Sequence, residues 1–236
     1  MAILLLGFSS PGWGGVVVFD RVTLMEEAVY LKILTKGRFF AEGGILVDIY
    51  VDDKKIKRIL TGGDGYGYLK YKPERRGLIR LQARSHQGSG NGLLLVPDKK
   101  DQIIFIETES AFKDALFSEK LLGASRKATE SLSRKYTLIY ISRYVGVEWT
   151  RNWLAKEHFP QAVILKWQGP EMFSSLKAKG LRLYAFIGSG ALASAAAEYI
   201  EKRYVFEETP DGQSVKSWEE ITESLKNENA GAQAEF

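Results

Sequence analysis

The chain has 236 residues, of which 45% are hydrophobic and 12% aromatic, so it is long and apolar enough to bury the core of one large domain or two small ones. The formal net charge is only +4, with basic and acidic residues interspersed, and this composition does not indicate nucleic-acid binding. Cysteine is absent, which excludes disulfides, cysteine nucleophiles and thiolate metal sites. The two histidines, His86 and His158, form no metal-ligand cluster in the sequence, so a zinc site is not expected.

Residues 1–15 form an N-terminal apolar segment. A short apolar run at residues 3–8 continues into serine, proline and glycine, as at the end of a secretory signal peptide. No basic residue precedes this run, however, and it is too short to span a membrane. We interpret the segment either as a signal-peptide remnant or as a first strand with a loop. The compartment, cytoplasm or cell envelope, therefore stays open.

Residues 16–97 alternate between apolar and polar side chains with the period of β-strands. The expected strands are at residues 16–19, 28–35, 45–51, 56–60, 66–71, 78–83 and 93–96. A charged hairpin turn at Asp52-Asp53 and a glycine-rich loop at residues 85–92 separate some of them. Short strands with turn residues between them predict a β-sandwich. Basic residues are frequent here and are also typical of edge strands guarded against aggregation: Lys54, Lys55, Lys57, Arg58, Lys70, Lys72, Arg75 and Arg76.

Three short motifs in this segment carry a family resemblance. They are the turn Asp64-Gly65-Tyr66, the strand end Tyr71-Lys72-Pro73 and the strand end Ala83-Arg84. With them, the segment resembles the Ig-like modules of bacterial proteins. The resemblance implies a module that spaces, docks or binds partners.

Strands and helices alternate in residues 101–208, after the polar linker expected at residues 97–101. Strands are expected at residues 103–107, 136–141, 162–165, 181–187 and 204–207, and helices at 118–132, 147–158, 170–179 and 191–203. This order predicts an α/β fold with a parallel sheet and right-handed crossovers. Residues 209–236 are expected to form a C-terminal helix, at residues 215–226, and a flexible tail.

Glu107 and Glu109 follow the first of these strands, whose apolar residues 103–106 indicate a strand buried on both faces. They lie at its carboxyl end, where open α/β sheets bind ligands. A hydrophobic strand followed by two acids one residue apart resembles the first motif of the haloacid dehalogenase-like (HAD) phosphatases. In that family both acids are aspartates, one a nucleophile and the other an acid/base, and magnesium bridges them to the phosphate.

Further motifs extend this resemblance. Ser142 ends the second strand, as does the family's phosphate-binding residue, and residues 143–146, 150–154 and 158–160 resemble the lipin-like and App-type phosphatidate phosphatase branch. Lys177 or Lys179 would be the lysine of the third motif. The fourth motif has two acids in the family, whereas this chain has Ser189 and Ser194 in their places.

These departures imply a degenerate, capless HAD-like domain. The longer glutamate displaces the attacking oxygen by about an ångström, which can cost ~100-fold in rate, and magnesium would lack carboxylate ligands at Ser189 and Ser194. We therefore predict a non-catalytic binding or assembly protein with no metal or other cofactor. Its partner is expected to be a protein or assembly, with a membrane surface as an alternative. Weak anion binding is expected from hydroxyl, ammonium and backbone N–H donors, at Ser142, Lys177, Lys179, Gly188, Ser189 and Gly190.

Two alternatives remain. The first is a divergent magnesium-dependent phosphohydrolase, similar to the phosphatidate phosphatases, that uses Glu107, Glu109, Ser142 and a lysine. The second is dinucleotide binding, because Gly188-x-Gly190-x-x-Ala193 opens a helix after an apolar strand and Glu207 follows about twenty residues on. Against the second, few strand–helix units follow this motif.

Overall fold

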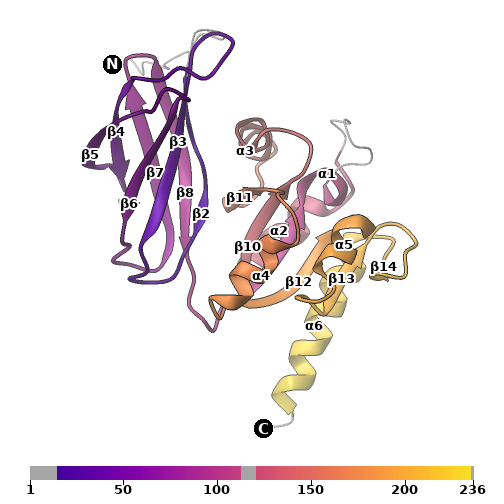
Figure 1. The fold of residues 1–236 in the computed structure, drawn as a ribbon. Helices are drawn as coiled ribbons and strands as arrows, with labels where there is room; N and C mark the ends of the chain where they lie inside the picture. Colours follow the sequence, from indigo (N-terminus) through magenta and orange to yellow (C-terminus); the bar gives the residue numbers. More distant parts are fainter. Residues whose placement is uncertain (1–14, 113–120, 235–236) are drawn as a thin grey trace, which may run out of the picture. The chain divides into compact units, whose positions relative to one another are not determined.

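The computed structural model describes residues 15–112 and 121–234, and its contacts divide the chain into two compact units (Figure 1). The sandwich unit contains Ala28–Lys72 and Ile79–Leu94 together with the described residues up to Phe19. The α/β unit contains the described residues from Leu95 onward. Two short upstream segments, Asp20–Glu27 and Pro73–Leu78, also group with the α/β unit. The sequence pattern did not indicate this interleaving.

Two β-sheets form the predicted sandwich. One has the strand order β1 (Gly15–Val18), β3 (Val29–Lys36), β6 (Tyr66–Tyr71). The other has the order β2 (Arg21–Val22), β8 (Gly88–Val96), β7 (Gly77–Ser85), β4 (Leu46–Val51), β5 (Lys54–Leu60). Strand β3 pairs antiparallel with β1 and β6, and β4 pairs antiparallel with β5 and β7. Alternate residues such as Leu31, Ile33, Val47 and Ile49 are buried, as the period-2 pattern predicts.

The prediction of a loop at residues 85–92 is wrong for most of its length, because β8 already begins at Gly88. The glycines that suggested a loop instead allow β8 to lie very close to β1, where a side chain would not fit. A Cβ atom on Gly90 would lie 1.9 Å from the carbonyl oxygen of Val16, and one on Gly92 would lie 2.6 Å from Cγ1 of Val18. Glycine inside a strand often marks such an approach of another backbone.

The α/β unit contains a sheet in which every pair of neighbouring strands is parallel, as predicted. Its order is β11 (Val163–Lys166), β10 (Thr137–Ser142), β9 (Gln102–Glu107), β12 (Arg182–Gly188), β13 (Lys202–Val205), β14 (Gln213–Ser214). Numbered along the chain, these strands lie in the order 3-2-1-4-5-6, that of doubly wound α/β folds. Strand β14 was not predicted.

Helices cover both faces of β9. On one face, Ile104 and Ile106 belong to a core cluster with side chains of α2 (Ser125–Ser133), α3 (Val147–Lys156) and α6 (Trp218–Ala234). On the other face lie α4 (Glu171–Ala178) and α5 (Gly190–Ala196), where Phe173 contacts Phe105 edge to face at 5.2 Å between ring centroids. The first strand is therefore buried on both sides, as its apolar run predicted.

Three helix ends differ from the prediction. Helix α2 begins only at Ser125, and residues 118–120 lie outside the described part of the chain. Helix α5 ends at Ala196 rather than near residue 203, where the chain turns and the backbone N–H groups of Tyr199 and Ile200 both donate to the carbonyl oxygen of Ala196. Helix α6 continues to Ala234 through most of the predicted flexible tail. Among the described residues, no helix is long and apolar enough to cross a membrane.

Candidate functional site

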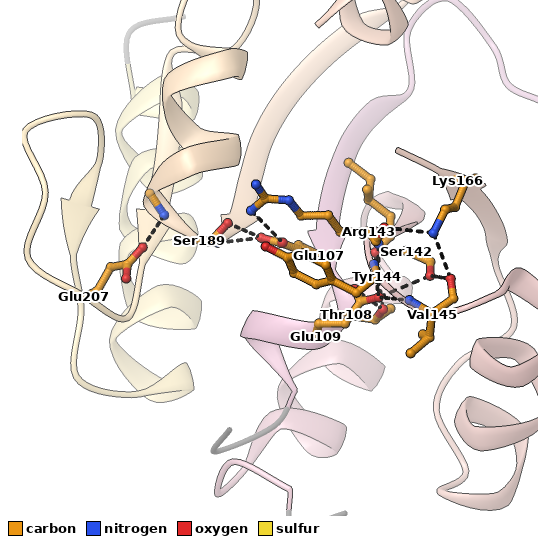
Figure 2. Close-up of polar contacts among 12 residues, drawn as sticks. Glu107, Thr108, Glu109, Ser142, Arg143, Tyr144, Val145, Lys166, Ser189 and Glu207 are labelled. Carbon is orange, nitrogen blue, oxygen red and sulfur yellow. Dashed lines mark hydrogen bonds and ion pairs between the residues drawn. The ribbon is translucent and has the colours of Figure 1, made fainter. Parts of the chain in front are cut away.

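The carboxyl ends of β9, β10 and β12 bring several predicted site residues together (Figure 2). Glu107 is the last residue of β9, and Glu109 lies in the short helix α1 (Thr108–Ala111) that follows. Ser142 ends β10, and Ser189 directly follows β12. Doubly wound folds bind their ligands at this edge of the sheet, next to the strand where the order reverses.

The carboxylate of Glu109 is buried and fills the loop that follows β10. Its Oε1 atom accepts the backbone N–H groups of Arg143 (3.0 Å), Tyr144 (3.1 Å) and Val145 (3.4 Å). Its Oε2 atom accepts the hydroxyl of Thr108 at 2.9 Å. Successive backbone N–H groups that converge in this way form an anion site. In this chain, that site holds one of the protein's own carboxylates.

Ser142 takes part in the same internal network. Its Oγ atom lies 2.8 Å from the carbonyl oxygen of Val145 and 3.2 Å from Oε1 of Glu109, and it accepts the hydroxyl of Thr150 at 3.2 Å. The residue is completely buried. Its hydroxyl therefore holds the loop together instead of facing an open site.

Lys166 is a site residue that the sequence analysis missed. It is the last residue of β11, and its ammonium donates to the carbonyl oxygens of Arg143 (2.8 Å) and Val145 (3.0 Å). The same loop thus has its N–H groups bonded to Glu109 and two of its carbonyls bonded to Lys166. The only signal in the sequence was a lysine at the end of a strand that neighbours β10.

Glu107 is buried against the turn after β12. Its Oε2 atom accepts the backbone N–H (2.7 Å) and the hydroxyl (2.5 Å) of Ser189. Its Oε1 atom has no hydrogen-bond partner, and the guanidinium of Arg143 lies 4.0 Å away. Burial raises the pKa of Glu107, and the charge of Glu109 acts in the same direction, while the bonds from Ser189 oppose them. Gly188 permits this contact, since a Cβ atom there would lie 2.7 Å from Cβ of Glu107.

Glu207 occupies the start of α5. Its Oε1 atom accepts the backbone N–H of Gly190 at 2.5 Å. The glycine turn between strand and helix that the dinucleotide motif requires is therefore present. However, the N–H groups of Ser189 and Gly190, which would face a pyrophosphate, already donate to Glu107 and Glu207.

The two predicted lysines and one predicted serine do not reach the glutamate pair. Lys177 is near the end of α4 and donates to the carbonyl oxygen of Glu198 at 3.3 Å. Lys179 directly follows α4 and pairs with Glu27. Because α4 leads into the start of β12, both lysines lie at the amino edge of the sheet. Ser194 is exposed on α5.

A resident magnesium ion does not fit the side chains at this edge. Both oxygens of Glu109 and one oxygen of Glu107 already accept hydrogen bonds, and Ser189 and Ser194 supply no carboxylate. Magnesium requires octahedral coordination by oxygen ligands. Within the described ranges, no group of three or more His, Asp or Glu residues could hold a metal ion.

No protein-family model matches the chain, and no curated protein matches it. Similar solved structures include the CARDB domain of a Pyrococcus furiosus protein, with 13% identity and a TM-score of 0.27 over 36% of this chain and 92% of that one. An IG27 protein domain has 9% identity and a TM-score of 0.31 over 38% and 100%. Fibronectin(III)-like modules of Clostridium thermocellum CbhA have 14% identity and a TM-score of 0.26 over 36% and 47%. By its own strand pairing, the N-terminal region of this chain is a β-sandwich of two antiparallel sheets, and a domain with a parallel sheet and helices follows it.

Proposed function

We propose that this protein is a non-catalytic binding or assembly protein whose α/β domain is a degenerate, capless HAD-like phosphatase fold. The two acids after β9, Ser142 after β10 and the glycine turn after β12 support this family. The main observation in favour of a non-catalytic protein is the position of Glu109. Its carboxylate accepts the three loop N–H groups that would otherwise be free to bind a phosphate.

The extra methylene of each glutamate, compared with aspartate, explains how these carboxylates reach the N–H groups of the neighbouring loops. From α1, the longer side chain of Glu109 reaches the loop beyond β10, and Glu107 reaches across to Ser189 beyond β12. An entering anion would have to displace a buried carboxylate that already has good hydrogen bonds, and it would meet like charge. We therefore expect no anion at this edge, in contrast to the weak binding that the sequence suggested.

Steady-state hydrolysis of p-nitrophenyl phosphate and of phosphatidate, with magnesium present, tests this proposal. The wild type and Glu107→Gln should both remain at the background rate, because the side chains at this edge do not fit a magnesium ion. Glu130→Gln, at an exposed position on α2, is the matched control. Magnesium-dependent turnover that Glu107→Gln abolishes and Glu130→Gln preserves would overturn the proposal.

That outcome would favour the second candidate, a divergent magnesium-dependent phosphohydrolase similar to the phosphatidate phosphatases. One observation supports it. Oε1 of Glu107 is buried without a hydrogen-bond partner, and the nearby guanidinium of Arg143 carries positive charge. A carboxylate nucleophile needs one such oxygen free for attack.

A further inference from the structure

The outer face of the three-stranded sheet in the sandwich unit combines tyrosine and lysine side chains. Register places Tyr30 on β3 directly opposite Lys70 on β6, and Lys32 opposite Tyr68. Tyr66 lies on β6 two residues before Tyr68, on the same face and opposite Leu34. We call this surface the tyrosine–lysine face, and it consists of Tyr30, Lys32, Leu34, Tyr66, Tyr68 and Lys70.

The rings of this face are exposed and partly pre-ordered. Tyr30 is 59% and Tyr68 54% exposed. The rings of Tyr66 and Tyr68 are stacked with centroids 6.5 Å apart, and Phe19 extends the row at 6.3 Å from Tyr66. The ammonium of Lys32 lies 4.1 Å from the Tyr66 centroid and 5.0 Å from that of Phe19. Such cation–π contacts hold the lysine in place among the rings.

The charge on this face is of one sign. The outward positions of the described strands β3 and β6 carry lysine, tyrosine and leucine and no acid. On the other sheet, by contrast, Asp48 pairs with Arg58 and Lys55. The backbone of β3 is engaged on both sides by β1 and β6, so its part of the face can recognise a partner only through side chains.

We propose that the tyrosine–lysine face binds an acidic polysaccharide. The negative face of an aromatic ring attracts the C–H groups on one side of a sugar ring, and lysine ammonium groups pair with uronate carboxylates. An extended sugar chain fits a flat sheet face better than a small molecule does, because small molecules bind in concave sites.

Two other occupants fit less well. A second copy of this face would place lysines against lysines, and like-charge juxtaposition is costly. Single-stranded nucleic acid is typically bound in a basic groove that follows its backbone, whereas the tyrosine–lysine face is the outer face of a sheet. The proposal concerns the sandwich unit alone and does not depend on whether the α/β unit is catalytic.

Isothermal titration calorimetry of the full chain with polygalacturonate tests this inference. We expect binding that weakens with added salt and with methyl-esterified polygalacturonate, in which the carboxylates are blocked. Tyr30→Ala and Tyr68→Ala should each weaken binding about tenfold, the loss expected for one ring contact. Lys70→Gln should weaken polygalacturonate binding and leave that of the esterified polymer unchanged. The controls are Phe39→Ala, 77% exposed elsewhere in the sandwich unit, and Lys57→Gln on the exposed strand β5.

Failure to bind polygalacturonate, or binding that responds equally to the control variants, would overturn the proposal. Oligothymidylate is titrated in parallel. If it binds more tightly than polygalacturonate and loses affinity in the tyrosine variants, the face binds nucleic acid instead. Thermal unfolding of every variant verifies that each one is folded. Because no titration involves Glu107 or Glu109, a negative result here leaves the proposed function untouched, and phosphatase activity would leave this inference untouched.

Discussion

Glu109 shows how a single buried side chain can hold a loop in place. Its side chain is long enough to reach the N–H groups of Arg143, Tyr144 and Val145, and hydrogen bonds to a charged group stabilise more than neutral ones do. A glutamate at this position is therefore expected to stabilise the loop.

The first prediction concerns the length of that side chain. Glu109→Asp should lower the free energy of unfolding by about 2 kcal/mol, because the shorter carboxylate leaves buried N–H groups without an acceptor. Urea denaturation measures this change. Glu130→Asp, on the exposed surface of α2, is the control and should be close to neutral. Equal stability of wild type and Glu109→Asp would mean that Glu109 does not hold the loop.

The second prediction concerns the pH dependence that Glu107 causes. Burial raises the pKa of Glu107 above its ordinary value of 4.5, so the folded protein holds this proton more tightly than the unfolded chain does. Its contribution to stability is complete below pH 4.5 and is lost as the pH rises through the raised pKa. Urea denaturation across this range should show a smaller loss of stability in Glu107→Gln than in the wild type. Parallel curves would contradict the raised pKa.

Part of the site could be predicted because the carboxyl ends of parallel strands meet at one edge. Strand ends alone were enough to bring Glu107, Ser142 and Ser189 together. The prediction of a lysine near the glutamates was less successful. It took a lysine from the next helix, and Lys177 and Lys179 lie at the opposite edge of the sheet. The capture of the loop N–H groups by Glu109 depends on the loop's conformation, which no residue pattern displays.

At the scale of elements, glycines decide how closely strands and turns approach one another. In β8 they resemble a loop in the sequence, although Gly90 and Gly92 are strand residues facing β1 at short range. Periodicity predicted most strands and helices, because it reports which face is buried. It could not show the end of α5, where the backbone N–H groups of Tyr199 and Ile200 turn back to the carbonyl oxygen of Ala196.

The third prediction concerns Gly188 at the end of β12. A Cβ atom there would lie 2.7 Å from Cβ of Glu107 and equally close to the ring of Phe186. Gly188→Ala should therefore destabilise the protein by about 1–3 kcal/mol, the usual cost of overpacking a core. Gly146→Ala is the matched control, since nothing lies within 4 Å of its added Cβ. Thermal unfolding compares the two, and equal losses would contradict the steric argument.

At the scale of the whole molecule, the α/β unit depends on residues from far upstream. The buried carboxylate of Asp20 accepts the backbone N–H of Ile164 at 2.7 Å and pairs with the guanidinium of Arg151 at 2.7 Å. Asp20 groups with the α/β unit by its contacts. A boundary placed at residues 97–101 would leave this acid outside the unit that it supports.

The fourth prediction follows from this contact. Asp20→Ala should lower the free energy of unfolding by about 3 kcal/mol, because it leaves the partly buried charge of Arg151 and the backbone N–H of Ile164 without their acceptor. Adding Arg151→Met should recover part of the loss. Urea denaturation of the single and double variants measures both effects. A double variant no more stable than Asp20→Ala would show that the uncompensated charge is not the cause.

The interleaving of the two units also constrains how such a gene could be rearranged. The chain crosses between units at Phe19/Asp20, Glu27/Ala28, Lys72/Pro73, Leu78/Ile79 and Leu94/Leu95. A single recombination breakpoint therefore cannot transfer the α/β unit intact, since its Asp20–Glu27 segment would remain with the other part. During synthesis, likewise, Asp20 leaves the ribosome long before Ile164 exists to receive it. The two units are accordingly expected to be inherited as one piece, and the α/β unit to complete its folding only near the end of translation.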